Sequence, residues 1–149
     1  MEEQTLVLIK PDAMVKNLAG NIIQEINSSG LKMVAMKLVN VQKELAEKHY
    51  EELKDKPFFE DVIKHLTGEL HNNENVIAIV YRGKNAITKI RKIAGSTHPE
   101  EADFTSLRGR YGRFHSKTDC LETVIHSSDS KESAKKEIEL WFNDDEIIN

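Results

Sequence analysis

The sequence has 149 residues, 39% of them apolar and 31% charged, and a formal net charge of −4; this size and balance predict one globular domain spanning residues 1–149. The negative charge excludes a protein that coats nucleic acid through bulk positive charge, and a single cysteine, Cys120, excludes an internal disulfide or a thiolate zinc cluster. No apolar run approaches the roughly 20 residues of a membrane span and the first residues lack a basic signal region, so we expect a cytoplasmic protein with no membrane partner.

Predicted strands and helices alternate along the chain. Apolar runs and apolar residues at helical spacing predict, in chain order, strand 5–10, helix 17–30, strand 31–41, helices 43–53 and 57–66, strand 76–82, helix 85–95, strand 121–126 and helix 130–142. Lys10 closes the first strand before Pro11, and Pro57 suits the first turn of its helix. The alternation lacks a glycine-rich fingerprint and predicts an α/β (α+β) fold, with a ferredoxin-like sandwich of antiparallel strands and packed helices as the leading architecture.

Residues 96–120 have weak periodicity and are predicted to form a long, functional or disordered loop. Within it, RGRYGRFHSK (108–117) is basic with interleaved aromatic residues. Ferredoxin-like sheets also serve as RNA-binding modules, so RNA binding is the alternative function. However, Arg110 and Arg113 stand where the RNA-binding signature has an aromatic or apolar residue, and we do not expect a nucleic-acid partner.

The segment VIHSSDSKESAKKEI (124–138) places His126 just before a predicted helix start. Asp129 is the predicted cap of that helix with Glu132 completing a capping box, and such a helix start attracts phosphate. Glu137 falls on the edge of the buried stripe, where an imidazole N–H would satisfy its charge and leave the other ring nitrogen of His126 free. These residues alone leave open whether His126 is a structural residue, a nucleophile or a metal ligand, although no other ligand lies at zinc spacing from it.

Three cations stand in apolar or glycine-marked contexts and are candidates for binding phosphate: Lys10, Arg91 and Arg108. Phosphoryl transfer requires cations that contact the phosphate oxygens and a nucleophile aligned with the bond that breaks. These three cations and His126 would meet that requirement if the fold brings them together. The sequence contains neither a P-loop nor the motifs of a protein kinase, which excludes a glycine-loop phosphate cradle.

Several segments occur in the order found in one known family. LVLIKPDA, HYEELKDKPFF, IRKIAGSTHP, SLRG, VIHSSDS and ESAKKEIELWF resemble the motifs of nucleoside diphosphate kinases across nearly the whole chain. The resemblance implies a ferredoxin-like sandwich that moves the γ-phosphate of ATP or another nucleoside triphosphate to a nucleoside diphosphate. It also implies a ping-pong cycle through a phosphohistidine, Mg²⁺ as the cofactor, and a homo-oligomer that is a hexamer, tetramer or dimer.

The resemblance assigns a role to each matching position around the histidine. It implies that His126 is the nucleophile, phosphorylated on its pros nitrogen, and that Glu137 and Ser128 are the partners that orient it. Lys10 matches the family lysine that touches the γ-phosphate and the ribose hydroxyl, and Tyr50 matches a tyrosine beside the catalytic histidine.

The same comparison implies how the nucleotide is held. Phe58 matches the phenylalanine on which the base stacks and Val62 an apolar neighbour, a mode that tolerates any base because every base has a π-face. The implied phosphate ligands are Arg91, Thr97 and Arg108. Mg²⁺ would arrive on the nucleotide's phosphates, so no metal site on the protein is expected.

The chain departs from the family pattern at a few positions. Thr123 stands where the family has an asparagine that reaches the ribose hydroxyl, Ser127 replaces the glycine after the histidine, and Ala13 replaces another glycine. The segments 67–75 and 109–120 are longer than the pattern. A catalytically weakened relative kept for interactions is therefore a further alternative.

Overall fold

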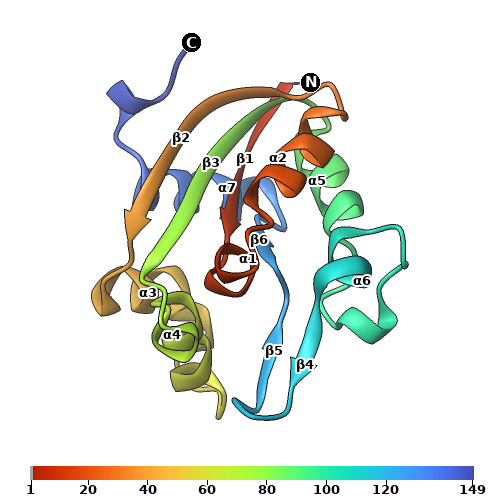
Figure 1. Ribbon diagram of the computed structural model, residues 1–149. Coiled ribbons are helices and arrows are strands. Elements are labelled where there is room, and N and C mark those ends of the chain that lie inside the picture. Colours follow the sequence, from red (N-terminus) through yellow and green to blue (C-terminus); the bar gives the residue numbers. More distant parts are fainter. Residues whose placement is uncertain (1) are drawn as a thin grey trace.

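The computed structural model describes residues 2–149, and a four-stranded sheet in the order β2-β3-β1-β6 forms its centre (Figure 1). The strands are β1 (Glu2–Ile9), β2 (Lys32–Asn40), β3 (Asn75–Lys84) and β6 (Ile125–Ser127), and all neighbouring pairs are antiparallel. β1 lies inside the sheet because residues 6–9 are apolar on both faces, and they are fully buried. This is the strand order of a ferredoxin-like sandwich, which confirms the predicted fold class.

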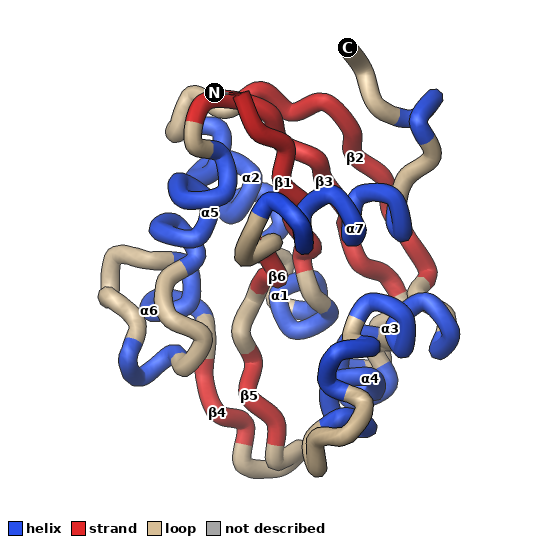
Figure 2. Tube along the Cα trace, turned by 180° about the vertical axis from the view of Figure 1, so that it is seen from behind, coloured by secondary structure: helices blue, strands red, loops and turns tan. Residues whose placement is uncertain are grey.

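Helices cover both faces of the sheet (Figures 1 and 2). One face carries α2 (Ala19–Asn27) and α5 (Ala86–Ala94), and the other carries α7 (Lys131–Trp141) together with α3 (Lys43–His49) and α4 (Phe59–Leu66). Because successive strand residues point to opposite faces, β1 contributes to both cores. No helix within residues 2–149 combines the length and apolarity that a membrane crossing requires.

The structure differs from the predicted elements in a few places. Residues 96–120, predicted as a loop, contain α6 (Leu107–Tyr111), β4 (Arg113–His115) and the first residue of β5 (Cys120–Glu122), which pairs with β4 in a hairpin. A short helix, α1 (Pro11–Val15), follows β1 where the sequence indicated only a break. The helix predicted over 57–66 begins after Pro57, at Phe59.

The last predicted strand, 121–126, is split into β5 and β6 by a kink at Val124. This residue has a φ of 70°, in the left-handed region that β-branched residues rarely adopt. Asp12 holds the kink, because its Oδ2 accepts a hydrogen bond from the Val124 N–H at 3.0 Å. The Val124 carbonyl in turn accepts from the Lys10 N–H at 3.0 Å. The kink therefore places β6, which carries His126, directly beside the end of β1.

Candidate active site

A cavity of about 650 Å³ lies at the end of the sheet where β1 stops and β6 begins. Every site residue predicted from the sequence except Ser128 lines it: Lys10, Tyr50, Phe58, Val62, Arg91, Thr97, Arg108, Thr123, His126 and Glu137. Ser128 lies directly behind them, hydrogen-bonded to Glu137. The fold thus brings together residues from segments that are far apart in the sequence.

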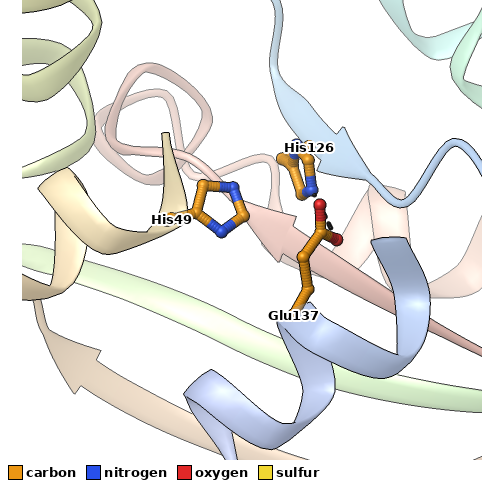
Figure 3. Close-up of side chains that lie close together, drawn as sticks. All are labelled: His49, His126 and Glu137. Carbon is orange, nitrogen blue, oxygen red and sulfur yellow. Dashed lines mark hydrogen bonds and ion pairs between the residues drawn. The ribbon is translucent and has the colours of Figure 1, made fainter. Parts of the chain in front are cut away.

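His126 and Glu137 face each other from β6 and α7 (Figure 3). The histidine Nε2 lies 3.0 Å from Oε2 of Glu137, and the Ser128 hydroxyl donates to the same oxygen at 2.7 Å. The carboxylate therefore favours a proton on Nε2, which leaves the lone pair of Nδ1 free. Both side chains remain partly accessible, His126 by 20% and Glu137 by 15%.

The helix that carries Glu137 does not begin as predicted. Ser130, not Asp129, is the N-cap of α7, and its hydroxyl accepts from the Ser133 N–H at 3.1 Å. The predicted capping box of Asp129 and Glu132 is therefore wrong by one residue. A serine and an aspartate in succession both suit the cap position, so local sequence could not separate them.

His49 lies next to the site and is not among the residues that the sequence predicted for it. Its Nδ1 accepts a hydrogen bond from the indole N–H of Trp141 at 3.0 Å, and its ring lies edge-on to His126 with centroids 4.4 Å apart. Burial lowers the pKa of His49 well below its ordinary value, and the charges of His126 and Lys10 add to this. His49 is therefore neutral. The sequence did contain one indication that His49 lies near the site, because His49 directly precedes Tyr50 in the motif HYEELKDKPFF.

His49, His126 and Glu137 each have one potential metal-ligand atom, and these three atoms lie within 4.8 Å of one another, a spacing at which a metal ion can be bound (Figure 3). The protonation of His49 argues against such a site. An indole N–H can only donate, so the neutral His49 ring carries its proton on Nε2, the nitrogen that points toward the other two side chains. A metal would have to displace that proton, and the donor set does not fit a resident metal ion.

Thr123, the first departure from the family pattern, contacts the buried lysine of the site. The Lys10 ammonium donates to the Thr123 hydroxyl at 2.9 Å, and the two side chains are almost fully buried. Burial lowers the pKa of Lys10, an effect that Asp12 opposes and Arg108 reinforces. Ser127, the second departure, points to the opposite face of β6 from His126 because strand residues alternate.

Replacing Thr123 by valine is expected to lower kcat/KM for the nucleoside triphosphate that the resemblance implies as substrate by about tenfold, because a hydrogen bond to a charged group contributes about 1.5–3 kcal/mol. Valine keeps the shape of threonine and leaves the Lys10 ammonium without this acceptor. Steady-state kinetics will measure the effect, with Thr123→Ser as the control that retains the hydroxyl. An unchanged kcat/KM in the valine variant would show that Lys10 does not depend on Thr123.

Arg108 makes three hydrogen bonds to the main chain at the edge of the cavity. Its guanidinium donates to the carbonyl oxygens of Thr123, Gly95 and Ile125 at 3.1, 2.9 and 2.9 Å. Burial lowers its pKa to about 10, with a contribution from Arg91, so it remains a cation at neutral pH. Arg108 therefore fixes the strand on either side of Val124 as well as contributing positive charge to the cavity.

The other arginines of the basic stretch are engaged within the fold. Arg110 pairs with Glu25 at 3.3 Å and lies over the ring of Tyr111, and Arg113 pairs with Glu122 at 3.0 Å. The stretch forms α6 and β4, outside the four-stranded sheet. RNA-binding modules of this fold use aromatic residues on the central strands, so the structure disfavours the RNA-binding alternative.

Buried cations beside an imidazole that a carboxylate orients, on a ferredoxin-like sandwich, define a site for phosphotransfer. Residues 3–147 match the family model described as "Nucleoside diphosphate kinase". The chain therefore belongs to the nucleoside diphosphate kinase family, whose members are phosphotransferases that act on nucleotides.

Individual relatives agree with this assignment. The chain is 45% identical to nucleoside diphosphate kinase of Pyrococcus abyssi, over 99% of this chain and 89% of that protein. A structure of the Halobacterium salinarum enzyme in complex with CDP matches with a TM-score of 0.89 and 34% identity, covering 100% of this chain and 93% of that one. The structure of the Borrelia burgdorferi enzyme with bound vanadate and ADP matches with a TM-score of 0.88 and 32% identity, covering 99% of this chain and 91% of that one.

Proposed function

We propose that this protein transfers the γ-phosphate of a nucleoside triphosphate to a nucleoside diphosphate by a ping-pong mechanism in which His126 carries the phosphate. The hydrogen bond between Nε2 of His126 and Glu137 carries the proposal, because it leaves Nδ1 as the nucleophile. Nδ1 forms a bond to the γ-phosphorus while the bridging P–O bond breaks and its electron pair leaves with the diphosphate. A second diphosphate then attacks the phosphohistidine through a terminal β-phosphate oxygen, and Nδ1 regains its lone pair.

The cations of the cavity would stabilise the charge on the transferred phosphate. Lys10, Arg91 and Arg108 line the cavity with Thr97, whose hydroxyl is a further donor. Burial raises the pKa of Tyr50, and Glu137 raises it further, so the phenol stays protonated and can donate beside His126. The convergence of these groups on one cavity favours an active enzyme over a weakened relative kept for interactions.

The nucleotide's base would stack on Phe58, which is 45% exposed at the cavity and has Val62 beside it. Stacking tolerates any base, so we propose broad base specificity; one relative was solved with CDP and another with ADP. Mg²⁺ would be bound by the nucleotide's phosphates and would neutralise part of their charge. The single domain, the homo-oligomer and the cytoplasmic location stay predictions.

Labelling tests this mechanism directly. Protein incubated with γ-labelled ATP should acquire acid-labile label, and each of ADP, GDP, CDP and UDP should remove it. His126→Gln should take up no label, whereas the matched control His98→Gln, altered at a residue that does not line the cavity, should label fully. Absence of label on the unaltered protein, or undiminished label in His126→Gln, would contradict the proposal.

A further inference from the structure

His49 contacts the ring of His126 without lining the cavity. The two rings are nearly perpendicular, with an interplanar angle of 83° and centroids 4.4 Å apart. Figure 3 shows an edge of the His49 ring facing His126 and Glu137. Because His49 is not part of the cavity lining, it does not touch a nucleotide bound there. An effect of His49 on phosphate transfer would therefore act through His126 or Glu137.

The hydrogen bond to Glu137 leaves the His126 ring one freedom of movement. The ring is attached to the chain at Cγ, and the bond to Glu137 holds Nε2. Rocking about the line that joins these two atoms leaves both in place, and the torsion of a histidine ring has a broad range. Nδ1 lies off that line, so rocking changes the direction of its lone pair, which lies in the ring plane. A contact on the face of the ring is needed to fix that direction.

His49 is itself held firmly enough to provide this contact. It is the last residue of α3, and its Nδ1 accepts from the indole N–H of Trp141, the last residue of α7, at 3.0 Å. The Tyr50 ring lies edge-on to it, with centroids 4.7 Å apart. Trp141 belongs to the core on that face of the sheet, with Tyr50 packed against it. The position of the His49 ring is therefore fixed by the packing of two helices.

The tautomer of His49 suits a contact with the dyad. The bond from Trp141 leaves the proton on Nε2, and a hydrogen rather than a lone pair faces His126 and Glu137. This nitrogen is buried and has no hydrogen-bond partner within residues 2–149. An N–H directed at an aromatic ring is a weak hydrogen bond, and its positive end also faces the Glu137 carboxylate. A buried donor without a full partner is unusual and calls for an explanation.

We infer that His49 is a positioning residue for His126: its ring edge, held by Trp141, stops the imidazole from rocking and fixes the direction of the Nδ1 lone pair. The inference rests on the proposed function, in which Nδ1 attacks the γ-phosphorus. Attack requires the lone pair to be aligned with the bond that breaks, and a misplacement of about 1 Å costs on the order of a hundredfold in rate. Glu137 thus selects which nitrogen attacks, and His49 sets its direction.

Rapid-quench labelling of His49→Ala with γ-labelled ATP tests this role. The rate of label uptake at saturating ATP is expected to fall about 10- to 100-fold, because the ring of His126 can then rock. The affinity for ADP, measured by calorimetric titration, should stay unchanged. His49→Phe restores a ring edge and should recover most of the rate. His98→Ala is the matched control, since it removes an imidazole that does not line the cavity.

Trp141→Phe tests the hold on His49 separately. Loss of the indole N–H frees the His49 proton to occupy either nitrogen, so the labelling rate should fall, although less than in His49→Ala. In the His49→Phe background the same substitution should leave the rate unchanged, because phenylalanine has no nitrogen for the indole to bind. Urea unfolding will show that each variant is folded under the conditions of the rate measurement.

The other outcomes contradict the inference. Equal labelling rates in His49→Ala and His98→Ala would show that His49 does not position His126, and a matching loss of ADP affinity would show a disturbed cavity instead. Nitrogen-15 NMR of histidine-labelled protein that placed the His49 proton on Nδ1 would also overturn it. An unaltered protein that takes up no label would contradict the phosphohistidine itself, and this role with it. Normal labelling of the unaltered protein with no loss in His49→Ala would contradict only the role of His49.

Discussion

Replacing His126 by glutamine is expected to lower the rate of phosphate transfer from a nucleoside triphosphate to a diphosphate by at least about a thousandfold, because the proposed reaction would lose its nucleophile. The amide of glutamine has no lone pair comparable with that of Nδ1. Its NH₂ group can still donate to Oε2 of Glu137, which the Ser128 hydroxyl also contacts, so the surroundings should keep their arrangement. Initial rates with saturating nucleotides will measure the loss.

His98→Gln is the control for this variant, because it removes an imidazole that does not line the cavity. Its rate should equal that of the unaltered protein, and circular dichroism should show both variants folded. A rate for His126→Gln within about tenfold of the unaltered protein would instead mean direct transfer between two bound nucleotides, since no phosphohistidine could then form.

Acidification is expected to destabilise the fold by about 3 kcal/mol through His65 alone. Burial lowers the pKa of His65 from 6.5 to about 4, and the charge of Lys10 adds to this against the opposing effect of Asp12. As pH falls, the unfolded chain binds this proton first. The stability contributed by neutral His65 is therefore fully present above pH 6.5 and lost by about pH 4.

Asp12, which accepts from Nε2 of His65 at 3.0 Å, extends the same trend to lower pH. Burial raises its pKa, but the hydrogen bond from His65 and the charge of Lys10 outweigh this and hold the pKa at about 2, below the ordinary 3.8. The folded state thus keeps Asp12 ionised at pH values where the unfolded chain already protonates it. Its contribution is present above pH 3.8 and is lost as pH falls toward 2.

Urea unfolding at about pH 7 and about pH 4.5 will measure the acid effect. His65→Gln removes the titrating ring while its amide can still donate to Asp12, so the loss of unfolding free energy between the two pH values should shrink. The pH-dependent loss of unfolding free energy should not vanish, because burial also lowers the pKa of His49, which therefore contributes a loss of the same sign. His98→Gln is the matched control, and a loss in His65→Gln as large as in the control would rule out His65 as the proton site.

Local patterns in the sequence were sufficient to predict the strands of the sheet, most of the helices and part of the site. Runs of apolar residues and their spacing report which face of an element is buried, and for that reason they located β1, β3, α5 and α7 within a few residues. The same spacing showed Glu137 on the edge of a buried stripe, where a carboxylate needs a partner. This local pattern did not identify His126 as a nucleophile, because a capped helix after a histidine is also an ordinary structural feature. The order of the motifs along the chain, through the resemblance to a known family, led to that prediction.

Contacts between distant segments required the folded chain. The indole of Trp141 sets the proton position of His49, 92 residues away, and Thr123 binds Lys10 across 113 residues. The unfavourable backbone of Val124, which separates β5 from β6, persists because Asp12 holds it from 112 positions earlier. Periodicity describes one element at a time and carries no information on such pairs, so the kink and the protonation of His49 emerge only when the elements pack.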